Sequence, residues 1–146
     1  MYCFIAIKRF NLINFSSSSR AYSADLVPAS EQSGVLEWID SLSAAGGTDL
    51  NLALIEALQF QDKGQLDRPL IILFLTDGLP TEGVTDIQQI LANIRKESGS
   101  AVRIFPFGVG DDVNTILLDG LALENRGSAA YVRPQESILE EVSGLF

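Results

Sequence analysis

The sequence of 146 residues contains no histidine, one cysteine and one methionine. Without histidine, neither a Ser-His-Asp nor a Cys-His mechanism can operate, although carboxylate or metal chemistry stays open. Cys3 cannot form a disulfide within the chain and has no neighbouring base to activate it as a nucleophile. We therefore interpret Cys3 as a small buried apolar side chain.

Basic residues and long apolar runs are also scarce. Ten Lys and Arg residues stand against nineteen Asp and Glu residues, and the resulting charge of −9 disfavours binding to nucleic acid or to anionic lipid. No apolar run approaches the roughly 20 residues that span a bilayer. We expect no nucleic-acid partner and no membrane insertion. The length and the 47% apolar content suit a single domain over residues 1–146.

The apolar start of the chain imitates a secretion signal only poorly. Lys8 and Arg9 follow the apolar stretch instead of preceding it, and the next residues have the pattern of a folded strand. No signal peptide or transmembrane segment is therefore assigned. The compartment stays open between a cytoplasmic chain as it stands and a secreted or cell-surface parent protein.

Apolar periodicity predicts alternating strands and helices. Strands are expected over residues 10–15, 21–27, 70–75, 102–109 and 129–132. Ser30, Thr48 and Thr85 are expected to cap helices, with further helices at residues 114–123 and near the end of the chain. The uninterrupted apolar run at 70–75 indicates a strand in the middle of the sheet, covered on both faces.

This order of elements predicts the fold class. Parallel strands joined by helical crossovers give a Rossmann-like three-layer α/β/α fold with a mainly parallel sheet. Pro106 removes one amide donor from its strand, so an edge-facing amide or a local irregularity is expected there.

Two oxygen-bearing side chains stand where such folds bind ligands. Asp77 follows the apolar strand directly, on a turn that Gly78 and Pro80 help to shape, and Thr48 opens a helix. Carboxylate and hydroxyl oxygens suit Mg²⁺, Mn²⁺ or Ca²⁺. The spacing alone leaves a structural alternative open, in which Thr48 is a helix cap and Asp77 only forms the turn.

A resemblance to a known family favours the metal-binding interpretation. It rests on residues 9–16 (RFNLINFS), 46–50 (GGTDL), 73–81 (LFLTDGLPT) and 104–110 (IFPFGVG). These segments resemble consecutive sequence motifs of the von Willebrand factor type A family. Within that family they are most similar to the inter-α-trypsin inhibitor heavy-chain type. The resemblance covers nearly everything from Arg9 onward.

The resemblance implies a metal-ion-dependent adhesion site, in which a divalent cation accepts a carboxylate from a partner protein. Thr48 and Asp77 match two of the family's metal-binding positions. Its remaining ligands lie in an Asp-x-Ser-x-Ser motif on the first strand, which is absent here, since no acid precedes Asp25. The expected site is therefore partial, with Mg²⁺, Mn²⁺ or Ca²⁺ bound weakly or not at all, at roughly millimolar affinity or worse.

The residues around these two positions are expected to contact the partner. By their place beside Thr48 and Asp77 they are Gly46, Gly47, Gly78, Pro80 and Thr81.

The first strand and helix of the family are missing, so the resemblance implies a truncated fold with a gap between the strands at 10–15 and 70–75. Our preferred hypothesis is that these two strands pair directly, with the first lengthened by residues 2–7. The alternative is that a second chain donates a strand, giving a strand-swapped dimer.

Three functions are compatible with these features. The first is a non-catalytic protein-binding module of adhesion or scaffold type with a partial metal site. The second is the truncated product of a gene for a larger protein of the family. The third is a metal-assisted hydrolase using Asp77, which lacks the second nearby acid such catalysis needs. We expect no enzymatic activity.

Overall fold

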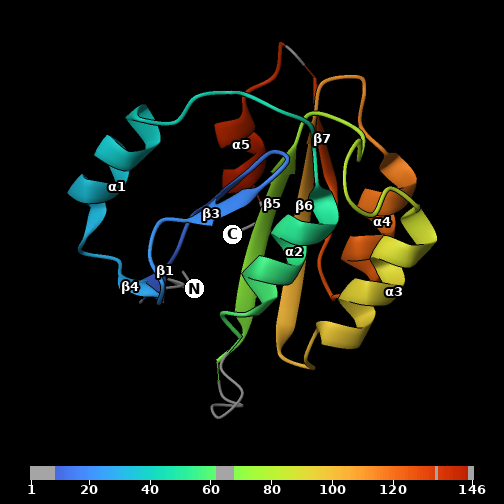
Figure 1. Cartoon of the computed structure of the whole chain (residues 1–146), viewed down its shortest axis with the longest axis horizontal. Coiled ribbons are helices and arrows are strands. Elements are labelled where there is room, and N and C mark those ends of the chain that lie inside the picture. The colour runs from blue at the N-terminus through green and yellow to red at the C-terminus, as the bar shows by residue number, and fades with distance from the viewer. Residues whose placement is uncertain (1–8, 62–67, 134, 145–146) are drawn as a thin grey trace.

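A computed structural model describes residues 9–61, 68–133 and 135–144 (Figure 1). Its strands are β1 (Arg9–Phe10), β2 (Ile13–Phe15), β3 (Ser19–Ala21), β4 (Val27–Pro28), β5 (Leu70–Thr76), β6 (Val102–Val109) and β7 (Ala130–Val132). Its helices are α1 (Gln32–Asp40), α2 (Leu50–Leu58), α3 (Ile87–Glu97), α4 (Thr115–Glu124) and α5 (Ile138–Ser143). None of these helices is long and apolar enough to cross a membrane.

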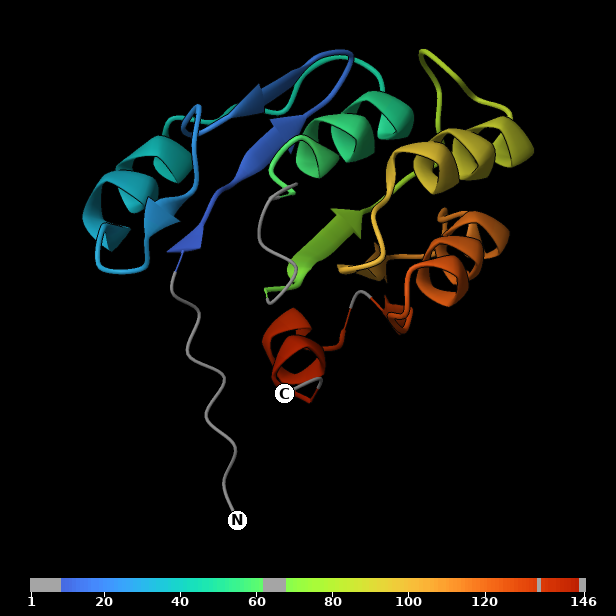
Figure 2. The ribbon, with the colours of Figure 1, turned by 90° about the horizontal axis from the view of Figure 1, so that it is seen from below.

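The strands β5, β6 and β7 form a parallel sheet in that order. The register runs from Leu70 opposite Val102 to Thr76 opposite Gly108. Helices α2, α3 and α4 pack along one face, and α5 lies on the other side next to β7 (Figure 2). The expected α/β/α arrangement of layers around a parallel sheet is confirmed.

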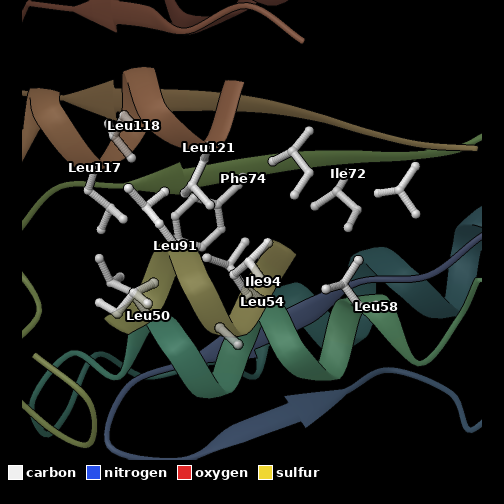
Figure 3. Close-up of a cluster of buried hydrophobic side chains, with 14 residues drawn as sticks. Leu50, Leu54, Leu58, Ile72, Phe74, Leu91, Ile94, Leu117, Leu118 and Leu121 are labelled. Atoms are coloured by element: carbon white, nitrogen blue, oxygen red, sulfur yellow. The ribbon is translucent and has the colours of Figure 1, made fainter. Parts of the chain in front are cut away.

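The core lies between the sheet and the three helices on its first face. The apolar stripes of these helices meet the inward side chains of β5 and β6, as Figure 3 shows. The cluster consists of Leu50, Ala53, Leu54, Leu58, Ile72, Phe74, Ile90, Leu91, Ile94, Val102, Ile104, Leu117, Leu118 and Leu121. Removing this apolar surface from water is the main term that stabilises the sheet against the helices.

The prediction that residues 70–75 lie mid-sheet and are covered on both faces is wrong. Among the strands that the structure describes, β5 lies at the edge of the sheet, and its side chains alternate between buried and exposed. Leu73 and Leu75 are 40% and 42% exposed because α5 covers only the part of that face near β7. An apolar run shows that a strand can be buried on both faces. Whether other elements actually cover those faces depends on the rest of the molecule.

The N-terminal strands form two separate antiparallel ladders, β1 with β4 and β2 with β3. The strand expected at 10–15 is interrupted at Asn11, whose side chain donates to the Ser23 carbonyl (2.7 Å) and accepts from the Leu12 amide (2.9 Å). The strand expected at 21–27 is likewise replaced by β3 and β4. β2 does not pair with β5, so our preferred hypothesis for closing the gap is wrong. Its extension by residues 2–7 lies outside the described residues.

Three predicted helix caps are also wrong. The carboxylates of Asp49 and Asp86 each accept an amide hydrogen bond from the first turn of α2 and α3, at 2.9 and 2.8 Å. Thr48 and Thr85 therefore do not cap these helices, and Ser30 lies one residue before the N-cap position of α1. α2 and α3 start slightly later than expected because Asp49 and Asp86 occupy the capping positions, whereas Glu31 at the N-cap of α1 makes no side-chain capping bond.

Several apolar side chains of α1 and α5 are exposed. Leu36 and Ile39 of α1 and Leu139 of α5 are all exposed, the last at 74%. The contact made by α1 is instead an edge-to-face pair between Trp38 and Tyr22, with ring centroids 5.7 Å apart. α1 lies apart from the parallel sheet, beside the N-terminal strands, and α5 contacts the sheet at β7 (Figure 1).

Of the two expectations for Pro106, the edge-facing amide position agrees with the structure, and β6 continues through the proline in regular register with β5. The Ile104 amide points to the β7 side of β6, where it donates to the Asn125 carbonyl (3.2 Å). Alternate residues of a strand point the same way, so the missing donor of Pro106 falls on this side. β7 pairs with β6 only from Phe107 onward, so the ladder begins just after the proline.

Candidate functional site

A cleft of about 420 Å³ lies between β2 and β5, at the end of the sheet where the parallel strands terminate. Its walls consist of Ile13, Asn14, Phe15, Thr48, Leu75, Thr76, Asp77 and Val109. Thr48 and Asp77 are 29 positions apart in the sequence, yet the fold brings them to this single cleft. The two residues predicted from the sequence as metal ligands therefore line the same cleft.

Hydrogen bonds between two loops fix the position of Thr48. Its amide donates to the Thr81 hydroxyl (2.8 Å), and its carbonyl accepts from the amides of Thr81 (2.9 Å) and Glu82 (3.2 Å). Asp49 caps α2 directly behind it, so the capping alternative for Thr48 does not hold. The Thr48 side chain is left available to the cleft while its backbone is held in place.

The two glycines before Thr48 accommodate neighbouring side chains of the chain itself. Gly46 has a φ of +86°, and the Gly47 amide donates to the Ser17 hydroxyl (2.7 Å). A Cβ atom on Gly47 would lie 2.5 Å from a carboxylate oxygen of Glu82. The glycines thus allow Ser17 and Glu82 to approach the loop closely.

Asp77 stands exposed on the turn that follows β5. The turn is held by the buried Thr76, whose hydroxyl donates to the Gly78 carbonyl (3.3 Å) and accepts from the Gly78 amide (3.4 Å). A Cβ atom on Gly78 would meet nothing within 4 Å, and Pro80 is half-buried. The Asp77 carboxylate forms no side-chain hydrogen bond with the part of the chain that the structure describes.

Sequence reasoning missed two polar residues of the cleft. Asn14 lines the wall formed by β2, and Thr76 closes the floor beside Asp77. Asn14 interrupts an apolar strand, and this polar interruption was the available signal. The amide oxygen of Asn14 adds a third kind of hard oxygen donor to the cleft.

The donor set fits a hard cation only in part. A hydroxyl, a carboxylate and an amide are the groups that Mg²⁺ or Ca²⁺ accepts, but the cleft supplies a single carboxylate. Among the described residues, no group of three or more His, Cys, Asp or Glu side chains is placed to hold a metal. Water or a carboxylate from another molecule has to complete the coordination.

The loop after β6 offers no competing site. Asn114 accepts a hydrogen bond from the Leu117 amide (2.9 Å) and so caps α4, while Asp111 and Asp112 are exposed before it. These residues therefore belong to the start of α4, where a cap and negative charge are favourable.

The parallel α/β sheet is of Rossmann-like type, and its oxygen-lined cleft lies at the carboxyl ends of the strands, where open α/β sheets generally bind ligands. The sequence model of one protein family, the von Willebrand factor type A domain, matches residues 7–144 of this chain. The chain therefore belongs to the von Willebrand factor type A domain family.

Individual relatives agree with this assignment. The chain is 32% identical over 145 residues to inter-alpha-trypsin inhibitor heavy chain H1 of Sus scrofa, covering 94% of this chain and 16% of the relative. It thus spans about a sixth of that relative's length.

Solved structures share the fold. One is a von Willebrand factor type A structure from Catenulispora acidiphila, with a TM-score of 0.72, 22% identity, and coverage of 86% of this chain and 30% of that one. Another is proximal thread matrix protein 1 from the mussel byssus with a zinc-occupied MIDAS motif. Its TM-score is 0.65 at 21% identity, with coverage of 92% of this chain and 33% of the other.

Proposed function

We propose that this chain is a non-catalytic protein-binding module whose cleft holds a divalent cation between Thr48 and Asp77, with the cation accepting a carboxylate from a partner protein. The observation that carries the proposal is the presence of both residues in one cleft. Family membership supports it, as does the zinc-occupied MIDAS motif of the mussel protein with the same fold.

The single carboxylate of the cleft shapes the proposal in two ways. It makes binding of Mg²⁺, Mn²⁺ or Ca²⁺ weak in the isolated chain, at roughly millimolar affinity. It also leaves coordination positions that a partner carboxylate fills, so cation and partner strengthen each other's binding. Gly46, Gly47, Gly78, Pro80 and Thr81 surround the two ligands and form the proposed contact rim.

Calorimetric titration with Mg²⁺ and Mn²⁺ tests the metal site. Asp77→Asn keeps the shape of the side chain but removes its charge, and we expect it to weaken cation binding at least about tenfold. Asp111→Asn is the matched control, because Asp111 is an exposed acid outside the cleft. Micromolar binding that survives Asp77→Asn would show that the cation lies elsewhere.

A pair of short peptides tests the partner chemistry. A peptide with one glutamate should bind only when the cation is present, and its glutamine counterpart should not bind. Equal binding of both peptides, or binding that is insensitive to EDTA, would refute a carboxylate bridge to the metal.

A further inference from the structure

The strand β5 presents a backbone edge that no described strand pairs with. The Leu70 amide donates to the Ala101 carbonyl (3.1 Å) on the β6 side, so the backbone groups of every second residue from Leu70 face β6. The backbone groups of Ile71, Leu73 and Leu75 consequently point away from β6. All seven residues of β5 are uncharged, and none is proline, so the edge lacks the usual protection against strand addition.

The cleft places a second unpaired edge opposite this one. β2 pairs with β3 on one side only, and its other side faces the cleft that β5 also lines (Figure 2). The two strands meet through the stacked rings of Phe15 and Phe74, whose centroids are 5.6 Å apart. A strand placed in this cleft would therefore find backbone partners on both sides and an aromatic floor.

The chain itself contains a segment suited to this position. Residues 2–7 read Tyr-Cys-Phe-Ile-Ala-Ile, a composition rich in aromatic and β-branched residues, and they lie outside the described part of the structure. Six extended residues span about 20 Å, close to the roughly 23 Å of the seven-residue β5.

A segment of the same chain cannot easily enter the cleft. Arg9 in β1 already pairs with Pro28 in β4, and only Lys8 separates Arg9 from the apolar segment 2–7. The shortest common hairpin connection needs two residues, so one residue is too few for the chain to turn back beside β2. A second copy of the chain has no such restriction.

We propose that residues 2–7 of one copy add as a strand to the free edge of β5 in a second copy, within the cleft between β2 and β5. Reciprocal exchange closes a two-fold dimer and leaves no β5 edge exposed. The association depends on backbone edges and apolar side chains and uses no cation as a ligand, so it persists in EDTA.

Cysteine cross-linking tests the arrangement, because Cys3 is the only cysteine of the chain and lies within the donated segment. Leu75→Cys places a thiol in the cleft, and Leu123→Cys places one on the exposed outer side of α4. With EDTA present, mild oxidation of Leu75→Cys should give several times more disulfide-linked dimer than oxidation of Leu123→Cys or of the unmodified chain.

Two outcomes of this experiment would overturn the proposal. Equal cross-linking of the two variants would show that the segment does not reach the cleft. A disulfide formed within one chain of Leu75→Cys, detected as a monomer on a non-reducing gel, would show that the segment fills its own cleft.

A second variant removes the edge itself. Leu73→Pro deletes an amide that points away from β6, so it takes no bond from the β5–β6 ladder, while Leu73→Ala keeps that amide. Light scattering across a concentration series should show at least about a tenfold weaker dimer for the proline variant and less than about a threefold change for alanine. A chain that stays monomeric at its highest soluble concentration, or a dimer that survives deletion of residues 2–7, would refute the exchange. Neither result bears on cation binding, which Asp77→Asn tests separately.

Discussion

Alanine in place of Gly83 is expected to lower the free energy of unfolding by about 2 kcal/mol. Gly83 has a φ of +64°, which alanine adopts at a cost of about 1 kcal/mol. Its added Cβ would also lie 2.8 Å from the Asp49 Oδ1 atom that accepts the capping hydrogen bond of α2. Displacing that carboxylate removes the cap, which costs about 1 kcal/mol more.

A double-mutant cycle separates the two contributions. Asp49→Ala alone removes the cap and is expected to cost about 1 kcal/mol. In that background Gly83→Ala retains only its backbone cost, so the double variant should lose about 2 kcal/mol instead of 3. The coupling of about 1 kcal/mol measures the contact between the two loops that position Thr48.

Urea unfolding followed by far-UV circular dichroism measures these differences, and thermal unfolding should show a shift of roughly 6 °C for Gly83→Ala. Gly110→Ala is the matched control, because Gly110 has a φ of +88° but nothing within 4 Å of an added Cβ. It should cost only the backbone term of about 1 kcal/mol. Additive effects of Gly83→Ala and Asp49→Ala would refute the proposed contact.

Two further predictions concern the sheet. Burial and a hydrogen bond to the Asp119 carboxylate (2.6 Å) raise the pKa of the Tyr131 phenol, so its stabilising contribution is present below about pH 10 and is lost as the pH rises through the raised pKa. Tyr131→Phe should lower the free energy of unfolding by about 1 kcal/mol at pH 7. Above pH 10 the variant should lose less stability with rising pH than the unmodified chain, and identical pH profiles of unfolding would contradict this. Gly127→Ala should cost more than about 3 kcal/mol in chemical unfolding, because its Cβ would overlap the Ile104 carbonyl of β6, whereas Gly78→Ala should change stability by less than about 1 kcal/mol. Similar costs for the two alanine variants would contradict this packing argument.

The fold could be predicted from periodicity because its central elements bury one continuous face. The inner stripe of α3, with Ile90, Leu91 and Ile94, and the strand β6 lie where the apolar pattern placed them. The exposure of Leu73 and Leu75 could not be predicted in this way. It depends on which strand and helix lie next to β5, and nothing in residues 70–75 records those neighbours.

The candidate site was predictable for a different reason. Parallel strands end at one edge of a sheet, so Asp77, placed directly after an apolar strand, had to lie near that edge. Its proximity to Thr48 followed from the family resemblance and agrees with the structure. Asn14 was missed because β2 had been joined to β1 in one buried strand, which left the direction of its polar side chain undetermined.

The separation of β1–β4 from the β5–β7 sheet bears on how cooperatively the molecule unfolds. Among the described residues the two parts share no strand ladder. They are joined by the backbone bond from the Asp49 amide to the Ser16 carbonyl (2.9 Å), the bond from the Gly47 amide to the Ser17 hydroxyl (2.7 Å) and the stacked rings of Phe15 and Phe74. The single tryptophan, Trp38, belongs to the N-terminal part, whereas most helical signal comes from the other. Fluorescence and circular dichroism therefore report on different halves of the molecule. Amide hydrogen exchange should be faster in the β2–β3 hairpin than in β6, whose amides form hydrogen bonds within the parallel sheet beneath the packed helices.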